Sequence, residues 1–174
     1  MVAVARRTRC IFWLFGTNEE EAKEWLSPIR EAGATCETIS MLSYPDYLER
    51  VAQAAVGLQP VCTENAFSRG KSFGKVLAYL AGQVAVVASN NVDHPLLFDG
   101  SNGVLLENDV DEWADEIVKL MENVQHRSEI AIAGWNIFNS RLITSVSATL
   151  FDRVFREAIA RSTLNKLGHA ELQS

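Results

Sequence analysis

The sequence contains few residues of the kinds that build metal centres or disulfide frameworks. Its three cysteines, Cys10, Cys36 and Cys62, are 26 residues apart in both steps (36 − 10 and 62 − 36). Their odd number, and the buried strand expected at each, favour small hydrophobic side chains over disulfides or metal ligands. The three histidines are scattered and have no metal-ligand spacing. We therefore expect neither a metal site nor a cofactor.

Long apolar runs are also missing. No run approaches the roughly 18 residues that a membrane-spanning helix needs, and the start, MVAVARRTRC, has no apolar core placed as in a signal peptide. The net charge of −6 argues against a nucleic-acid-binding scaffold, which would carry a basic stripe. A length of 174 residues with 48% hydrophobic content suits one globular domain. We expect a cytoplasmic protein with no transmembrane segment and no nucleic-acid partner.

Carboxylates are absent from Asn65 to Asn91, in a chain with 22 acidic and 16 basic residues. The segment ENAFSRGKSFGKVLAYLAGQVAVVAS instead places three cations, Arg69, Lys71 and Lys75, where a loop rich in Ser and Gly leads into an amphipathic helix. Helix N-termini bind anions through free amides and the macrodipole. The segment predicts an anion site; the alternative is a solvated basic face.

Strands and helices alternate along the chain. Apolar runs predict strands at 9–15, 34–39, 56–62, 84–88 and 103–106. Helical spacing predicts five helices: 19–33, Pro45 to Ala55, the cationic segment, a helix from Asp109 or Asp111 onward, and about Arg127 to Lys166. Pro28 should kink or split the first of these, and the last should be broken near 141–147. The pattern predicts the α/β class: a Rossmann-like parallel sheet with helices on both faces.

Ligands of such sheets bind at the carboxyl ends of the strands. The loop at Gly16, the start of the cationic helix and the loop SNNVDHP each follow a predicted strand. We therefore expect these three segments to meet at one rim. Trp13, Trp25, Trp113 and Trp135 have core spacing, and we expect all four to be buried.

Two segments carry a family resemblance. KSFGKVLAYLAGQVAVVASN and LLFDGSNGVLLENDVDEWADEIVKLMEN are similar to the helix-then-strand and turn-strand-helix signatures of the C-terminal, donor-binding domain of GT-B fold, retaining-type glycosyltransferases of group 1. The likeness is close over about the last two-thirds of the chain. It implies a nucleotide-sugar donor, linked to UDP, GDP or ADP, with residues 1–174 as a single donor-binding domain. The N-terminal acceptor domain would then be absent from this chain, and the isolated domain would be inactive.

The resemblance implies roles for particular residues. Arg69 and Lys71 would approach the donor diphosphate, supported by Lys75, the Gly16 loop and the amide of Ser72, to stabilise charge that develops on the leaving nucleotide. Met41 and Leu42, after the second strand, match the nucleobase-contacting region in position. Asp93 and His94 match a loop near the donor sugar, a surface loop being the alternative.

The family's pair of glutamates, eight positions apart, is missing, because Gly70 and Ala78 stand in their places. Glu64 or Asn65 would then replace the ribose-holding carboxylate. On the expectation that Ala78 lies on the same ridge as Lys71 and Lys75, facing whatever sits above the helix, Ala78→Glu would raise affinity for a nucleoside diphosphate. The alternative function is a degenerate, non-catalytic interaction module. A flavodoxin-like signalling domain fits less well, because no acidic cluster follows the first strand.

Overall fold

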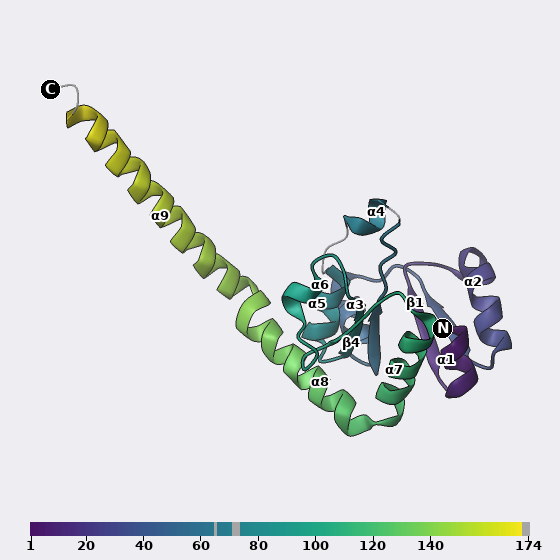
Figure 1. The fold of residues 1–174 in the computed structure, drawn as a ribbon. Coiled ribbons are helices and arrows are strands. Elements are labelled where there is room, and N and C mark those ends of the chain that lie inside the picture. Colours follow the sequence, from purple (N-terminus) through teal and green to yellow (C-terminus); the bar gives the residue numbers. More distant parts are fainter. Residues whose placement is uncertain (65, 71–73, 172–174) are drawn as a thin grey trace. The chain divides into compact units, whose positions relative to one another are not determined.

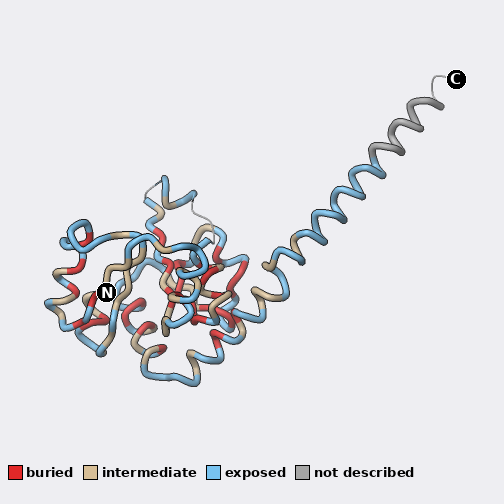
Figure 2. Tube along the Cα trace, turned by 180° about the vertical axis from the view of Figure 1, so that it is seen from behind, coloured by how far each residue is buried: buried red, intermediate tan, exposed pale blue. Residues whose placement is uncertain are grey.

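The computed structural model describes residues 1–64, 66–70 and 74–171, with the side chains of residues 162–171 excepted. The chain divides into two compact units, residues 1–136 and the residues from Ile137 onward. The first unit contains all the described strands and most of the buried side chains (Figures 1 and 2). It is the unit that carries every candidate site residue.

Strands and helices alternate in the first unit, which confirms the predicted fold class. Its elements are α1 (Val2–Arg7), β1 (Ile11–Phe15), α2 (Glu19–Glu31), β2 (Thr35–Ile39), α3 (Tyr44–Val51), β3 (Val56–Gln59), α4 (Ala66–Arg69), α5 (Gly74–Ala81), β4 (Ala85–Ser89), α6 (His94–Leu97), β5 (Val104–Leu106), α7 (Val110–Glu122) and α8 (Val124–Ile137).

The described strands pair in parallel, as predicted, but they form two sheets and not one. β1 pairs with β2, and β3, β4 and β5 pair in that order. The sequence predicted the strands correctly to within a few residues. It did not predict that β1 and β3 would remain unpaired with each other, because periodicity specifies a strand's faces and not its neighbours.

Local signals set the helix ends. Asn18 accepts a hydrogen bond from the Glu21 amide at 3.0 Å, and Asp109 accepts from the amides of Asp111 and Glu112, both at 2.9 Å, so each caps its helix. Helix α2 passes through Pro28 without being split, since only three residues follow it. The short helix α1 was not predicted, because six residues are too few to show a repeated helical spacing of apolar positions.

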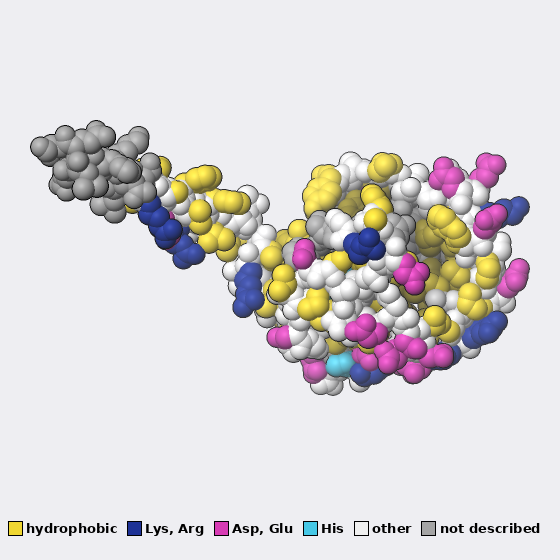
Figure 3. Space-filling view, turned by 45° about the horizontal axis from the view of Figure 1, so that its top comes forward, with side chains coloured by type: hydrophobic (Ala, Val, Ile, Leu, Met, Phe, Trp, Pro, Cys, Tyr) yellow, Lys and Arg dark blue, Asp and Glu magenta, His cyan; other side chains and the backbone are white. Residues whose placement is uncertain are grey.

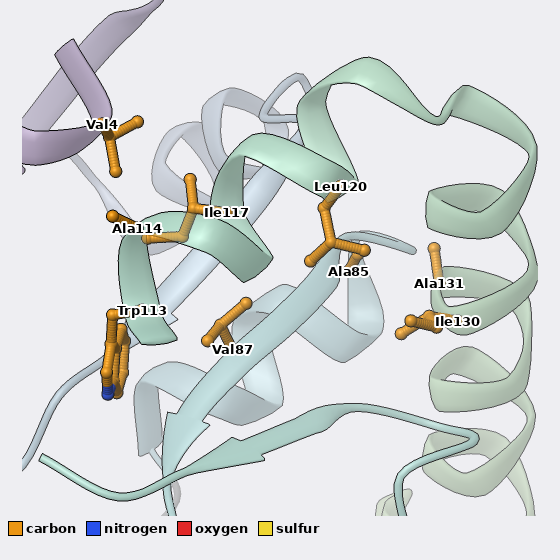
Figure 4. Close-up of a cluster of buried hydrophobic side chains, with 9 residues drawn as sticks. All are labelled: Val4, Ala85, Val87, Trp113, Ala114, Ile117, Leu120, Ile130 and Ala131. Carbon is orange, nitrogen blue, oxygen red and sulfur yellow. The ribbon is translucent and has the colours of Figure 1, made fainter. Parts of the chain in front are cut away.

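The main core lies where α1, α7 and α8 pack against β4. Figure 4 shows side chains from these four elements pointing toward one another. The cluster consists of Val4, Ala85, Val87, Trp113, Ala114, Ile117, Leu120, Ile130 and Ala131. Arg7 of α1 also pairs with Asp111, at 2.9 Å, and with Asp115 of α7. This packing places α1 beside α7, on the side of β4 that carries the main core.

Side chains tie the carboxyl ends of the second sheet together. The Ser89 hydroxyl oxygen accepts from the Val61 amide at 2.9 Å, and its hydroxyl donates to Asn108 Oδ1 at 3.3 Å. Asn108 donates in turn to the Val61 carbonyl at 3.4 Å. Ser89 is fully buried, so these contacts satisfy polar groups that water does not reach.

Several predictions about burial were wrong. Trp113 is buried, but Trp25 and Trp135 expose 66% and 41% of their surface, and Trp13 is half-buried. Cys36 is buried as expected, and burial raises the pKa of its thiol, whereas Cys62 lies exposed after β3. Trp25 and Trp135 lie on the helices α2 and α8, and on helices that cover a small sheet the flanks of the apolar stripe stay in solvent.

The second unit consists of a π-helical turn (Phe138–Leu142) and α9 (Thr144–Glu171). This turn and Ile143 give the predicted break. Described side chains of α9 are half-buried or exposed, and they include the stacked pair Phe151 and Phe155, with ring centroids 6.4 Å apart. Among the described residues, α9 and the other helices lack the combination of length and apolar character needed to cross a bilayer.

Candidate functional site

A hollow of about 1140 Å³ opens in the first unit, between the two sheets. We call it the central hollow. Hydrophobic side chains gather around a recess on the face shown in Figure 3. The lining residues that matter for the site are Gly16, Thr17, Ser40, Met41, Leu42, Tyr44, Tyr47, Lys75 and Tyr79. They come from the carboxyl ends of β1 and β2 and from helices α3 and α5.

The loops after β1 and β2 form the first part of the site. Gly16 has φ +77°, a left-handed conformation that glycine adopts without strain, and its amide donates to the Ile39 carbonyl at 2.8 Å. This bond holds the ends of the two strands together. Met41 and Leu42 follow β2 after one residue, Ser40, and Met41 is 87% exposed. The residues predicted near the diphosphate and the base therefore lie beside each other.

Lys75 brings a positive charge to the same hollow. It is the second described residue of α5, it is exposed, and no acidic residue lies in the first turn of this helix. The partial positive charge of a helix N-terminus adds to the attraction that such a cation exerts on an anion. The structure thus brings together Gly16, Met41, Leu42 and Lys75 of the predicted site.

Arg69 and Glu64 do not line the hollow. Arg69 Nη1 donates to the Thr63 carbonyl at 2.7 Å and to the Glu64 carbonyl at 3.5 Å, so its guanidinium holds the loop that precedes α4. The Glu64 side chain is exposed. The predicted site residues Asn65, Lys71 and Ser72 lie outside the described residues.

Aromatic side chains in the lining were missed by the sequence interpretation. Tyr44 is 68% exposed, and the ring of Tyr47 meets that of Phe15 edge-on at 5.3 Å between centroids. An exposed aromatic face can stack a flat, conjugated ring. The signal was present in SMLSYPDY, directly after the residues assigned to the base.

The loop after β4 does not reach the hollow. None of the described residues from Asn90 to His94 lines it. His94 is buried, and its Nδ1 lies 2.8 Å from the Ser89 carbonyl, which can only accept, so Nδ1 carries the proton. His94 therefore fixes this loop from inside the fold, and only two of the three expected segments meet.

Ala78 is not on an exposed ridge, and that prediction was wrong. It exposes 2% of its surface and lies between Val76 and Leu80, which are also buried. Three buried positions at a spacing of two mean that α5 is covered on more than one side. A helix covered in this way gives no exposed ridge at Ala78, and sequence spacing alone did not reveal this.

Tyr79 is the most perturbed titratable group at the hollow. Its ring lies against Gly57 of β3, and its hydroxyl donates to the Leu58 carbonyl at 3.3 Å. Burial raises the pKa of Tyr79 to about 12, more than the hydrogen bond lowers it. The phenol is therefore held in its neutral, donating form.

We expect this pKa to make the protein less stable at high pH. Between the ordinary tyrosine pKa of about 10 and the folded-state pKa of about 12, only the unfolded state loses the proton, so stability falls as pH rises. The loss by pH 12 is about 2 kcal/mol. Denaturant titrations at several pH values would measure it, and Tyr79→Phe should remove this part of the slope; equal slopes in both proteins would contradict the assignment.

A comparison with family models matches residues 1–123 to the family described as "Glycosyl transferases group 1". A search of curated proteins finds no match. Among solved structures, the C-terminal domain of a glycosyl transferase group 1 family protein (LpcC) from Francisella tularensis is similar, with a TM-score of 0.61 and 15% identity. The match covers 78% of this chain and 87% of that one.

Two longer proteins are also similar in fold. The Alr3699/HepE protein of Anabaena, in complex with UDP, has a TM-score of 0.58 and 18% identity, with 88% of this chain and 43% of that chain covered. TarM has a TM-score of 0.57 and 13% identity, with coverage of 87% and 31%. This chain thus spans less than half of either protein. The likenesses establish a fold shared with GT-B half-domains.

Proposed function

Since this chain belongs to the glycosyl transferases group 1 family, we propose that residues 1–174 form the domain that binds a nucleotide-diphosphate sugar. The observation that carries the proposal is the meeting of Gly16, Met41, Leu42 and Lys75 at one hollow. In the full enzyme, this domain would present the donor to an acceptor. The acceptor would be bound by an N-terminal domain that consists of residues other than 1–174. The retaining stereochemistry is part of the proposal.

Each side of the site has a chemical role in this proposal. The Lys75 ammonium and the amino-terminal end of α5 would face the diphosphate, whose negative charge grows as the sugar leaves. Lys71 and the Ser72 amide would add to this positive charge from the segment before α5, and Arg69 would support them by holding the loop ahead of α4. Tyr44 would stack the nucleobase beside Met41 and Leu42, with Glu64 or Asn65 as the ribose contact.

That the UDP complex of HepE shares this fold supports a uridine nucleotide as the first ligand to test. Calorimetric titration with UDP, GDP, ADP and inorganic pyrophosphate would test the proposal. We expect one nucleoside diphosphate to bind more tightly than pyrophosphate, because the base and ribose add contacts to those of the phosphates. If none of the three nucleotides binds, the donor-binding function is wrong.

Lys75→Ala should weaken binding of that nucleotide about five- to tenfold, the usual size of one charge-assisted contact. It should also flatten the dependence of affinity on salt, because fewer charged contacts remain to be screened. Lys119→Ala is a matched control, since Lys119 is exposed on α7 and pairs with Glu116 at 3.0 Å. Equal effects of the two substitutions would place the diphosphate away from Lys75.

A further inference from the structure

The edges of β1 and β3 face each other across the central hollow. Residues Ile11–Phe15 line it from one side and Val56 and Leu58 from the other. In the described part of the chain, β1 has a strand neighbour only in β2, and β3 only in β4. The edge of a strand carries free amide and carbonyl groups at every second residue. Two such edges therefore border one space.

The side chains show that β1 and β3 occupy the same layer. Phe12 of β1, and Val56 and Leu58 of β3, pack on the core cluster built around α7. In the opposite direction, Trp13 lies under the Arg50 guanidinium of α3, at 3.9 Å, and Gly57 lies under the Tyr79 ring of α5. Both strands thus turn one face to α7 and the other toward α3 and α5. They are coplanar members of an interrupted sheet.

The hollow has the size and the walls of a strand site. A five-residue strand measures about 4.8 by 10 by 17 Å, on the order of 800 Å³, and the hollow is about 1140 Å³. Apolar side chains close it on both faces: Val4, Ile117 and Met121 from α1 and α7, and Tyr47, Val51 and Tyr79 from α3 and α5. A strand covered on both faces is apolar at every position.

Two polar details fit an occupant with hydrogen-bonding groups. Trp13 Nε1 is a buried donor with no partner among the described residues. The Leu58 carbonyl, on β3, accepts from a side chain, the Tyr79 hydroxyl. Buried donors and acceptors in native proteins are normally paired.

We propose that the central hollow receives one further β-strand, a continuously apolar polypeptide segment from outside residues 1–171, which pairs with β1 on one edge and β3 on the other. The insertion joins the two sheets into one sheet with the order β2, β1, inserted strand, β3, β4, β5. This inference does not depend on the proposed donor-binding function. The nucleotide would bind at the loops beyond the strand ends.

The test is a fusion that supplies such a strand. A five-residue segment of Val and Ile is joined to Met1 through a flexible Gly and Ser linker, and hydrogen exchange is measured at the amides of β1 and β3. We expect exchange to slow at least tenfold in both strands and the thermal midpoint to rise. The matched control carries Pro at the central position, which lacks the N–H that pairing needs. It should protect neither strand.

The same segment, flanked by lysines for solubility and added as a free peptide at millimolar concentration, repeats the test without altering the chain. Protection of both edges by the Val and Ile segment alone supports the proposal. Protection of one edge only would indicate addition to a sheet edge, and equal protection by the Pro segment would indicate a hydrophobic plug without pairing. Either result, or no protection in both formats, overturns it.

Discussion

Replacing Ala78 with Glu is expected to destabilise the protein by about 3 kcal/mol or more, the cost of placing an unpaired carboxylate in a buried position. Ala78 exposes 2% of its surface, and its neighbours Val76 and Leu80 expose no more than 1%. In the folded state, burial would disfavour the charged form of the new carboxyl group, so its pKa would rise. The destabilisation should therefore be larger at pH 7 than at pH 4.

Urea unfolding of the wild type and the variant at both pH values would measure this effect. Ala66→Glu is the control, since it places the same side chain at an exposed alanine of α4 and should change stability by less than about 0.5 kcal/mol. A stable Ala78→Glu protein that binds a nucleoside diphosphate more tightly than the wild type would restore the ribose-facing role expected from the sequence.

Gly57→Ala is the second substitution expected to have a large effect. A Cβ at Gly57 would lie 2.4 Å from Cγ of Tyr79, at the root of the ring, where the side chain cannot swing aside. Forcing atoms into a packed site of this kind costs about 1–3 kcal/mol, and we expect the upper part of that range. The measurement is again the free energy of unfolding.

Two further variants isolate the clash. Gly70→Ala is the matched control, because its added Cβ would meet nothing closer than the Phe67 carbonyl oxygen at 3.7 Å. The double variant Gly57→Ala with Tyr79→Ala lacks the ring. Its loss of stability should therefore be smaller, by at least about 1 kcal/mol, than the sum of the losses in the two single variants. Additive costs would show that the ring does not oppose the new methyl group.

Residues with a strong local signal were predicted well. The strands β1 and β4 are apolar runs, and Asp109, one of the two positions expected to begin a helix, caps α7 before an acidic first turn. These features depend on neighbours in the chain, so one sequence contains the information. The fold class followed from their alternation.

Features that depend on distant contacts were predicted poorly. The gap between β1 and β3 involves residues more than 40 positions apart, and nothing in either strand states which edge remains open. Ala78 and Trp25 both satisfied helical spacings, yet the first is buried and the second exposed, because the elements that cover a helix decide which flank is in solvent. Tyr44 was missed because stacking aromatics have no fixed spacing.

We expect a nucleoside diphosphate to bind at the rim of the central hollow, beyond the strand ends, between the loop of Gly16 and the start of α5. Amide chemical-shift mapping during titration with UDP tests it most directly. We expect the largest shifts at Gly16, Met41, Leu42, Tyr44 and Lys75, and we expect those at Met41 to Tyr44 to be absent when inorganic pyrophosphate replaces UDP. Shifts confined to residues that do not line the hollow, such as those around Lys119, would contradict it.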